Sequence, residues 1–420
     1  MFLLDAAAIL IGLAALFGLF NHHVLKLPFA IGLMVSGLLA SLGVLGLDFV
    51  FPGLGLANAV RGAVLQVDFS AALLSGMLSL LLFAGALHTD LSLLRSRALP
   101  ILVLATLGVL LSTAVAGGIA FGVFGLFEID ISLAWCLVFG ALISPTDPIA
   151  VLGVMKAAGA PKELEIKVIG ESLFNDGVGV VVFTILLALA VGGAELDAVH
   201  IAGLFAEEVL GGIALGLVAG WLGMRALASM DEPNLEILIT LAIVLVIGLI
   251  AGRVHVSGPL AAVVAGLLLG NQARERAMSD RTQATLDTVW TFLDETLNAV
   301  LFLLIGIEVF AITLPDAGYV WAAGLLIPGV LMARLVGVSV PLGLVRRRVA
   351  LGPGAVRVLT WGGLKGGISI ALAMKTPEFP GREAVLAATY AVVVFSILVQ
   401  GLSVGPLIRR VLHEPSEQAA

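Results

Sequence analysis

The chain has 420 residues, of which 60% are hydrophobic and only 12% are charged. Soluble proteins carry roughly 25% charged residues, so this composition excludes an ordinary soluble domain and predicts an all-α polytopic membrane protein. The net charge of −7 points to no particular partner, and the single cysteine, Cys136, excludes a disulfide within the chain.

Apolar segments long enough to cross a bilayer follow one another along the whole chain. Prolines and glycines punctuate the junctions between them. We predict about thirteen transmembrane helices from this pattern, at 2–20, 27–47, 68–88, 98–125, 131–155, 165–191, 200–224, 235–252, 257–271, 285–313, 318–345, 355–375 and 384–408. A short cytoplasmic tail is expected at 412–420.

The placement of lysine and arginine predicts the topology. Most of the 22 Lys and Arg residues fall on one side of the predicted spans. Because positive loops stay in the cytoplasm, we expect a multi-pass protein of the plasma (inner) membrane with its N-terminus outside and its C-terminus in the cytoplasm. The basic run Arg346, Arg347 and Arg348 is expected to lie beside anionic lipid headgroups.

Thirteen helices divide into two sets of six joined by one linker helix. The first six-helix repeat would cover 1–192, linker helix 7 would cover 193–232, and a second repeat of opposite orientation would cover 233–411. The fifth helix of each half is interrupted, by Ser144-Pro145-Thr146-Asp147-Pro148 in one and by glycines around Lys365 in the other. Discontinuous helices at corresponding positions of inverted repeats are typical of a transporter's binding site.

A cluster of polar residues lies within the apolar segment 165–191. At 100° per residue, Glu171, Ser172, Asn175 and Asp176 share one helix face. Ionisable groups in the hydrocarbon region are functional candidates by default. The alternative is a structural salt bridge that joins two helices.

The interrupted helix at 144–148 supplies further oxygen atoms. Pro145 and Pro148 cannot both lie in a continuous helix, so backbone carbonyls around Thr146 are freed. Hard cations prefer oxygen ligands, and a monovalent ion such as Na⁺ suits the few formal charges. The predicted ligands are the freed carbonyls and the side chains of Thr146, Asp147, Ser172 and Asp176.

Burial disfavours the charged form of a carboxylate. Either a proton or a cation can therefore neutralise Asp176, and competition for this site, exposed to alternate sides, is sufficient to couple two opposite flows.

Two basic residues, Arg334 and Lys365, fall in the interior of predicted spans rather than near their ends. A lone buried lysine is unfavourable, so we predict a structural ion pair between Lys365 and Glu171. For Arg334 the sequence leaves three candidate partners open, namely Asp294, Glu295 and Glu308.

Three motifs resemble those of one family. The stretch from Glu171 to Asp176, the stretch from Ser144 to Pro148, and Trp361-Gly362-Gly363-Leu364-Lys365-Gly366 are similar to prokaryotic Na⁺/H⁺ antiporters of the monovalent cation:proton antiporter family, which are related to animal sodium–proton exchangers. The resemblance implies a homodimer in which a core of predicted helices 4–6 and 11–13 moves like an elevator against a scaffold of predicted helices 1–3 and 7–10. It implies no cofactor beyond the transported Na⁺ and H⁺.

By resemblance, Asp147 and Asp176 match the cation-binding aspartates, and Glu171 matches the family's salt-bridge glutamate. Thr146, Ser172 and Asn175 match its supporting site residues. The pairing of Asn175 with Asp176 resembles electroneutral members, which implies one proton per cation.

Two positions depart from the family pattern. Lysine stands at Lys365, where the family commonly has arginine, and the loss of the guanidinium removes its bidentate geometry. Many members carry an acidic residue in helix 3, where this chain has Ala84 with His88 close by.

The sequence therefore predicts a secondary active antiporter that exchanges Na⁺ or Li⁺ for H⁺ and is not an enzyme. The alternatives are an antiporter for K⁺ or another cation, a cation channel, and an intramembrane aspartyl protease. The last alternative expects a Gly-x-Gly-Asp motif, which the sequence lacks.

Overall fold

The computed structural model describes residues 3–51, 55, 60, 62, 76–157, 159–160, 162–192, 198–311, 317–346 and 354–413. Residues 68–75 of one predicted span, Arg347 and Arg348 of the basic run, and most of the predicted tail lie outside these ranges. The described chain is almost entirely helical, and an isolated bridge between Asp147 and Leu364 is the strand-like pairing found in it.

In the first half of the chain the helices are α1 (Leu3–Phe20), η1 (Asn21–Leu25), α2 (Phe29–Val50), α5 (Leu78–Leu87), α6 (Leu91–Ser96), α7 (Ala98–Val103), η4 (Leu104–Gly108), α8 (Val109–Leu126), α9 (Leu133–Ile143), α10 (Ile149–Ala157) and α11 (Lys162–Gly192). The second half forms α12 (Ala198–Leu227), α13 (Pro233–Val254), α14 (Gly258–Leu268), η5 (Leu269–Ala273), α15 (Arg274–Ala277), α16 (Asp280–Ile307), η6 (Glu308–Ala311), α17 (Ala317–Val345), α18 (Ala355–Trp361), α19 (Gly367–Lys375), α20 (Arg382–Phe395), η7 (Ser396–Gln400) and α21 (Gly401–His413).

Within the described residues, 8 helical segments are long and apolar enough to cross a membrane, which confirms a polytopic all-α protein. Helices also occupy the other predicted ranges, but there they are shorter, interrupted or more polar. The predicted helices at 131–155 and 355–375 are each divided in two, as α9 with α10 and α18 with α19. The exact count of thirteen and the inverted repeat stay predictions.

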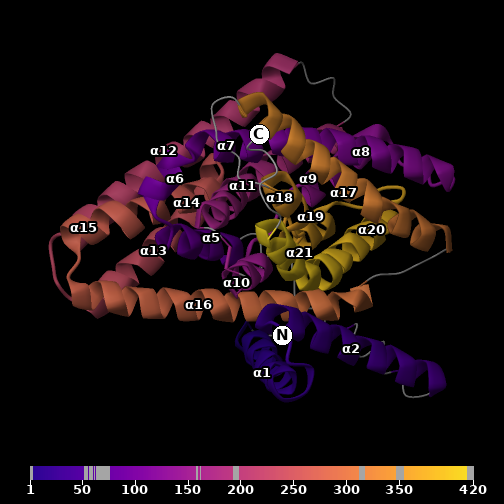
Figure 1. The fold of residues 1–420 in the computed structure, drawn as a ribbon, viewed down its shortest axis with the longest axis horizontal. Coiled ribbons are helices and arrows are strands. Elements are labelled where there is room, and N and C mark those ends of the chain that lie inside the picture. The colour runs from indigo at the N-terminus through magenta and orange to yellow at the C-terminus, as the bar shows by residue number, and fades with distance from the viewer. Residues whose placement is uncertain are drawn as a thin grey trace.

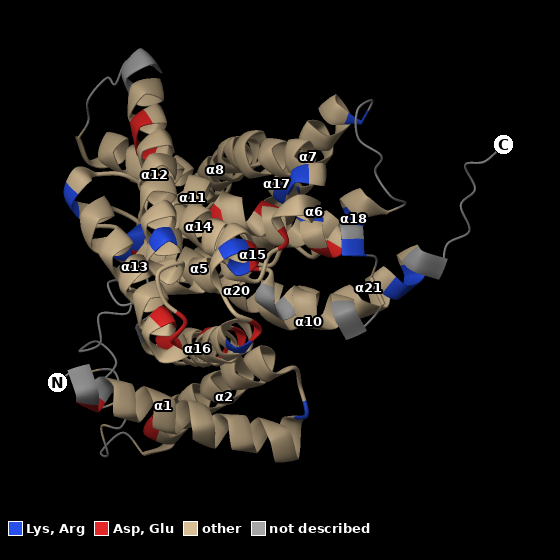
Figure 2. Cartoon of the chain, turned by 90° about the vertical axis from the view of Figure 1, so that its left-hand side faces the viewer, with Lys and Arg blue, Asp and Glu red and all other residues tan. Residues whose placement is uncertain are grey.

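Helix α16 runs along most of the length of the molecule, and α1 and α2 lie on one side of it (Figures 1 and 2). The contact between α2 and α16 is close because small residues meet there. A Cβ atom on Gly306 would lie 2.5 Å from the carbonyl oxygen of Met34. Small residues allow the backbones of membrane helices to approach one another in this way.

The buried apolar side chains form two main clusters. The larger one joins α8, α9, α17, α19 and α20 with parts of α2 and α16. The second one joins α5, α13, α14 and α16, and it includes a contact between the rings of Phe83 and Trp290, whose centroids are 4.7 Å apart. Helix α11 packs against helices of both groups, α9 in the first and α14 in the second, so residues on α11 can contact both.

The outer surface of the bundle is largely apolar. Leu210 and Trp221 of α12 and Leu238 of α13 are half exposed or more. Figure 2 views the end at which α6 and α15 lie, where lysine and arginine residues are visible, while most of the helix surface carries no charge. Exposed leucine and tryptophan along the helix flanks suit contact with lipid.

Candidate functional site

The two interrupted helices meet at their breaks. Helix α9 ends at Ile143, just before Pro145, and α18 ends at Trp361, just before the glycine-rich stretch. The backbone N–H of Asp147 donates to the carbonyl of Leu364 over 2.8 Å, and the two extended segments run antiparallel. Each break therefore satisfies part of the other's freed backbone, as non-helical chain at this depth requires.

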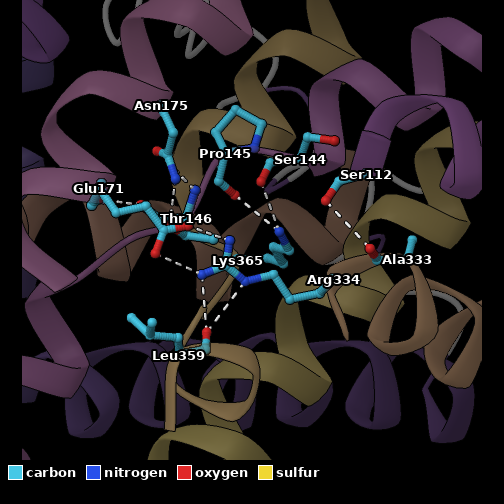
Figure 3. A network of polar contacts seen from close by, with 11 residues as sticks. Ser112, Ser144, Pro145, Thr146, Glu171, Asn175, Ala333, Arg334, Leu359 and Lys365 are labelled. Carbon is cyan, nitrogen blue, oxygen red and sulfur yellow. Dashed lines mark hydrogen bonds and ion pairs between the residues drawn. The ribbon is translucent and has the colours of Figure 1, made fainter. Parts of the chain in front are cut away.

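Lys365 stabilises the crossing from within. Its buried Nζ donates to the carbonyl oxygens of Ser144 at 2.9 Å and Pro145 at 3.2 Å (Figure 3). These carbonyls belong to the C-terminal end of α9, where the helix dipole is negative and attracts a cation. The ammonium group of Lys365 thus compensates the partial negative charge of these backbone carbonyls.

Glu171, which we predicted to pair with Lys365, forms its ion pair with an arginine side chain instead. Arg334 of α17 forms a buried bidentate ion pair with Glu171 of α11, through Nη1 to Oε1 and through Nη2 to Oε2 (Figure 3). The predicted Glu171–Lys365 pair is therefore wrong. Bidentate geometry requires the planar guanidinium, which lysine lacks.

The partner of Arg334 is therefore Glu171, which was not among the three candidates considered from the sequence, Asp294, Glu295 and Glu308. Arg334 donates further to the carbonyl of Leu359, from Nε at 3.3 Å and from Nη2 at 2.9 Å. The carbonyl of Leu359 lies in the last turn of α18, where helical partners are missing. One guanidinium therefore joins α11, α17 and the C-terminal end of α18.

Thr146 and Asn175 connect the first break to α11. The Asn175 Nδ2 donates to Thr146 Oγ1 over 2.8 Å, and the Thr146 backbone N–H donates weakly to Asn175 Oδ1 at 3.4 Å. The Ser172 hydroxyl donates to the Thr146 carbonyl in a short hydrogen bond. All three residues are buried, so they fix the backbone next to Asp147.

Asp147 and Asp176 line one cavity of about 320 Å³, together with Thr146 and Ser172. The Asp176 side chain is 4% exposed, and its Oδ1 has no hydrogen-bond partner. Buried polar oxygens are nearly always satisfied, and a carboxylate left uncompensated is especially unfavourable. The geometry suits a group that takes up a proton or a cation from the cavity.

The cavity leads from the two aspartates to the surface along α5. Ala84 lies on its wall, and His88, whose side chain is 35% exposed, lies at its rim. Leu301 of α16 and Gly367 of α19 also line the cavity and pack closely, because a Cβ on Gly367 would lie 2.2 Å from Leu301 Cδ1.

Residues 11–410 match the family model described as sodium/hydrogen exchanger, transmembrane. The chain belongs to this family. The Na⁺/H⁺ antiporter NhaP of Pseudomonas aeruginosa is 46% identical over 416 residues, which cover 97% of each chain. The Na⁺/H⁺ antiporter NhaH of Halobacillus dabanensis is 33% identical over 92% of each chain. The fold matches the sodium proton antiporter MjNhaP1 of Methanocaldococcus jannaschii with a TM-score of 0.77 at 20% identity, covering 98% of this chain and 99% of that one.

Sequence reasoning about this exchanger missed one residue of the cavity. Asp294 of α16 lines it with Asp147 and Asp176, although from the sequence Asp294 was a candidate only as a partner for Arg334. A signal was present in the sequence, because a carboxylate within a predicted span is a functional candidate by default.

Gly366 leaves room for the Asp147 side chain in this exchanger. A Cβ on Gly366 would lie 2.5 Å from Asp147 Oδ2. The backbone of Gly366 is extended, so an alanine there is hindered by this contact rather than by its own conformation. We expect Gly366→Ala to displace the carboxylate and to raise the KM for the cation about tenfold, in line with overpacking effects of about 1–3 kcal/mol.

Cation-dependent proton flux in proteoliposomes, measured with a pH-sensitive dye, checks this prediction. Gly118→Ala in α8 is the matched control, because nothing lies within 4 Å of a Cβ at that position. If the Gly366→Ala variant had the same KM for the cation as the unmodified protein, cation binding would not depend on the observed position of the Asp147 carboxylate.

Proposed function

We propose that this exchanger family member is a secondary active antiporter that exchanges Na⁺ or Li⁺ for H⁺ across the membrane. The observation that carries the proposal is the buried carboxylate of Asp176, whose Oδ1 has no hydrogen-bond partner, on a residue that lines a cavity together with Asp147. The names of the relatives, all Na⁺/H⁺ antiporters, support the same reaction.

In this proposal a proton and a cation compete for one site. Oxygen atoms of Asp147 and Asp176 bind the cation, with Thr146 and Ser172 at the same cavity wall. When the cation leaves, protonation of Asp176 removes a charge that would otherwise remain buried. Asn175, which donates a hydrogen bond to Thr146, has no titratable side chain. One proton would therefore move for each cation.

Alternating access requires one part of the protein to move against another. We assign predicted helices 4–6 and 11–13 to a moving core and predicted helices 1–3 and 7–10 to a scaffold that also forms a homodimer. The links that Arg334 and Lys365 make are all within the proposed core. Such links favour motion of that core as one rigid, elevator-like body, with the proposed inverted repeat supplying its two orientations.

The protein is a multi-pass membrane protein, and we place it in the plasma membrane. The distribution of lysine and arginine supports a cytoplasmic C-terminus and an external N-terminus. The exposed Arg346 at the end of α17 would then lie on the cytoplasmic side, within reach of anionic headgroups.

Reconstitution of the purified protein into proteoliposomes that enclose a pH-sensitive dye tests the proposed exchange. We expect external Na⁺ and Li⁺ to drive proton flux, and an imposed membrane potential to leave that flux unchanged, because a one-to-one exchange moves no net charge. A response to K⁺ alone would favour the alternative of a K⁺/H⁺ antiporter. Cation flux without proton counter-flow would contradict antiport, and a strong effect of potential would contradict the stoichiometry.

A further inference from the structure

The last long helical segment, from α20 to α21, contains one widened turn, η7. At this turn the backbone N–H of Gly401 donates to the carbonyl of Ser396, five residues earlier, which is the spacing of a π-helix. Single π-turns within α-helices are frequently found at functional sites. The turn begins and ends with buried polar side chains, because Ser396 is 0% exposed and Gln400 is 3% exposed.

Ser396 contacts the second break, the non-helical stretch between α18 and α19. Its hydroxyl accepts the backbone N–H of Lys365 over 2.9 Å. Thr389, seven residues earlier, shows the commoner arrangement in a helix, because its hydroxyl donates to the carbonyl of Val385 four residues before it. A backbone N–H in a non-helical stretch at membrane depth needs a partner. Ser396 supplies that partner and holds the break at Lys365.

Gln400 holds the other end of the same break. Its Nε2 donates to the carbonyl of Trp361 over 2.9 Å, and Trp361 Nε1 donates to the hydroxyl of Ser403 over 2.8 Å. Trp361 is the last residue of α18, and Lys365 lies four residues later. Two side chains from one turn of helix therefore hold both ends of the break.

One peptide group connects Ser396 to Asp147. The peptide group that joins Leu364 to Lys365 donates through its N–H to Ser396 Oγ and accepts at its carbonyl the backbone N–H of Asp147, over 2.8 Å. On the next residue, a Cβ on Gly366 would lie 2.5 Å from Asp147 Oδ2. A shift of this peptide group would therefore displace Asp147, which lines the cavity.

We propose that Ser396 and Gln400 are positioning residues for the carboxylate of Asp147. They act through the peptide group between Leu364 and Lys365, and the inference rests on the proposed cation exchange. A peptide group is planar, so an N–H held by Ser396 also fixes the direction of the carbonyl that binds the Asp147 backbone. Hydrogen bonds in a chain polarise one another, which makes that carbonyl a better acceptor.

Replacing Ser396 with alanine tests this role, because the substitution removes the acceptor and adds no volume. We expect the KM for Na⁺ to rise about threefold to tenfold, which corresponds to the loss of one hydrogen bond. The kcat should stay within about twofold, since Ser396 and the break both lie in the proposed core and move together. Gln400→Met keeps the side-chain length without the donor and should raise the KM in the same direction. Dye-reported exchange in proteoliposomes at a series of Na⁺ concentrations gives both constants.

Thr389→Val is the matched control. It removes a buried hydroxyl from the same helical segment, but that hydroxyl is bonded within its own helix, so the KM should not change. Thermal unfolding in detergent separates positioning from general stability. A merely structural role would lower the melting temperature or the folded amount and leave the KM of the folded molecules unchanged, because KM does not depend on the amount of active protein.

The outcomes distinguish this inference from the proposed function. If the unmodified protein exchanges Na⁺ for H⁺ but Ser396→Ala and Gln400→Met both keep its KM, the positioning role is disproved and antiport stands. An equal rise of KM in Thr389→Val would also disprove it. If Ser396→Ala does not fold, the KM of Gln400→Met decides. If the unmodified protein shows no exchange with any cation, the proposed function itself fails.

Discussion

Replacing Asp176 with asparagine is expected to reduce cation-driven proton flux by at least about 100-fold, since loss of a buried charged ligand amounts to about 3 kcal/mol or more. Asparagine has nearly the same shape but can neither neutralise a cation nor take up a proton. Asp176 has a buried oxygen without a hydrogen-bond partner, and the residue lines the cavity, so its substitution removes the group for which the cation and the proton are proposed to compete. Dye-reported flux with Na⁺ and Li⁺ in proteoliposomes provides the measurement.

Asp90→Asn is the matched control for this variant. Asp90 caps the N-terminus of α6 on the exposed surface by accepting from the backbone N–H groups of Ser92 and Leu93. Asparagine is an equally good N-cap, so the same substitution there should leave flux unchanged. An Asp176→Asn protein that retained flux close to that of the unmodified protein would place the exchange site elsewhere.

Replacing Arg334 with methionine is expected to destabilise the folded protein by about 3–5 kcal/mol, because Glu171 would remain buried without its partner. The substitution also removes both hydrogen bonds to the Leu359 carbonyl, which connect α17 to the last turn of α18. Thermal unfolding in detergent, followed by tryptophan fluorescence, measures the loss, and the same preparation shows the fraction of protein that folds.

A double-mutant cycle identifies the partner. Arg334→Met combined with Glu171→Gln should be less destabilising than the sum of the two single changes, since removal of both charges leaves neither unpaired. Lys365→Met combined with Glu171→Gln should be close to additive, because Lys365 donates to backbone carbonyls instead. The reverse pattern would restore the pairing that the sequence suggested.

These contacts divide the charged residues of the site into those that stabilise its structure and those that are available to bind a ligand. Two buried basic residues at the breaks, Arg334 and Lys365, are paired with Glu171 and with backbone carbonyls, respectively. Asp176 is consequently left with an oxygen that no side chain compensates. In the proposed mechanism this imbalance is what a proton or a metal ion corrects.

Local sequence features predicted the parts of this site that depend on local chemistry. Pro145 and Pro148 lack backbone donors, and the glycines around Lys365 favour a break, so both interruptions could be located before the structure was known. The high apolar content similarly identified a polytopic helical membrane protein, and the spacing of Glu171, Ser172, Asn175 and Asp176 placed them on one face of α11.

Only the tertiary structure decided which charges meet. Arg334 and Lys365 are both basic and both lie within predicted spans, and Coulomb attraction alone does not tell which of them binds Glu171. The choice follows from how α17 packs beside α11 and where the breaks cross, which are contacts between residues far apart in the chain. For the same reason the sequence alone did not show that Asp294 lines the cavity, because its place there follows from the packing of α16 beside the two breaks.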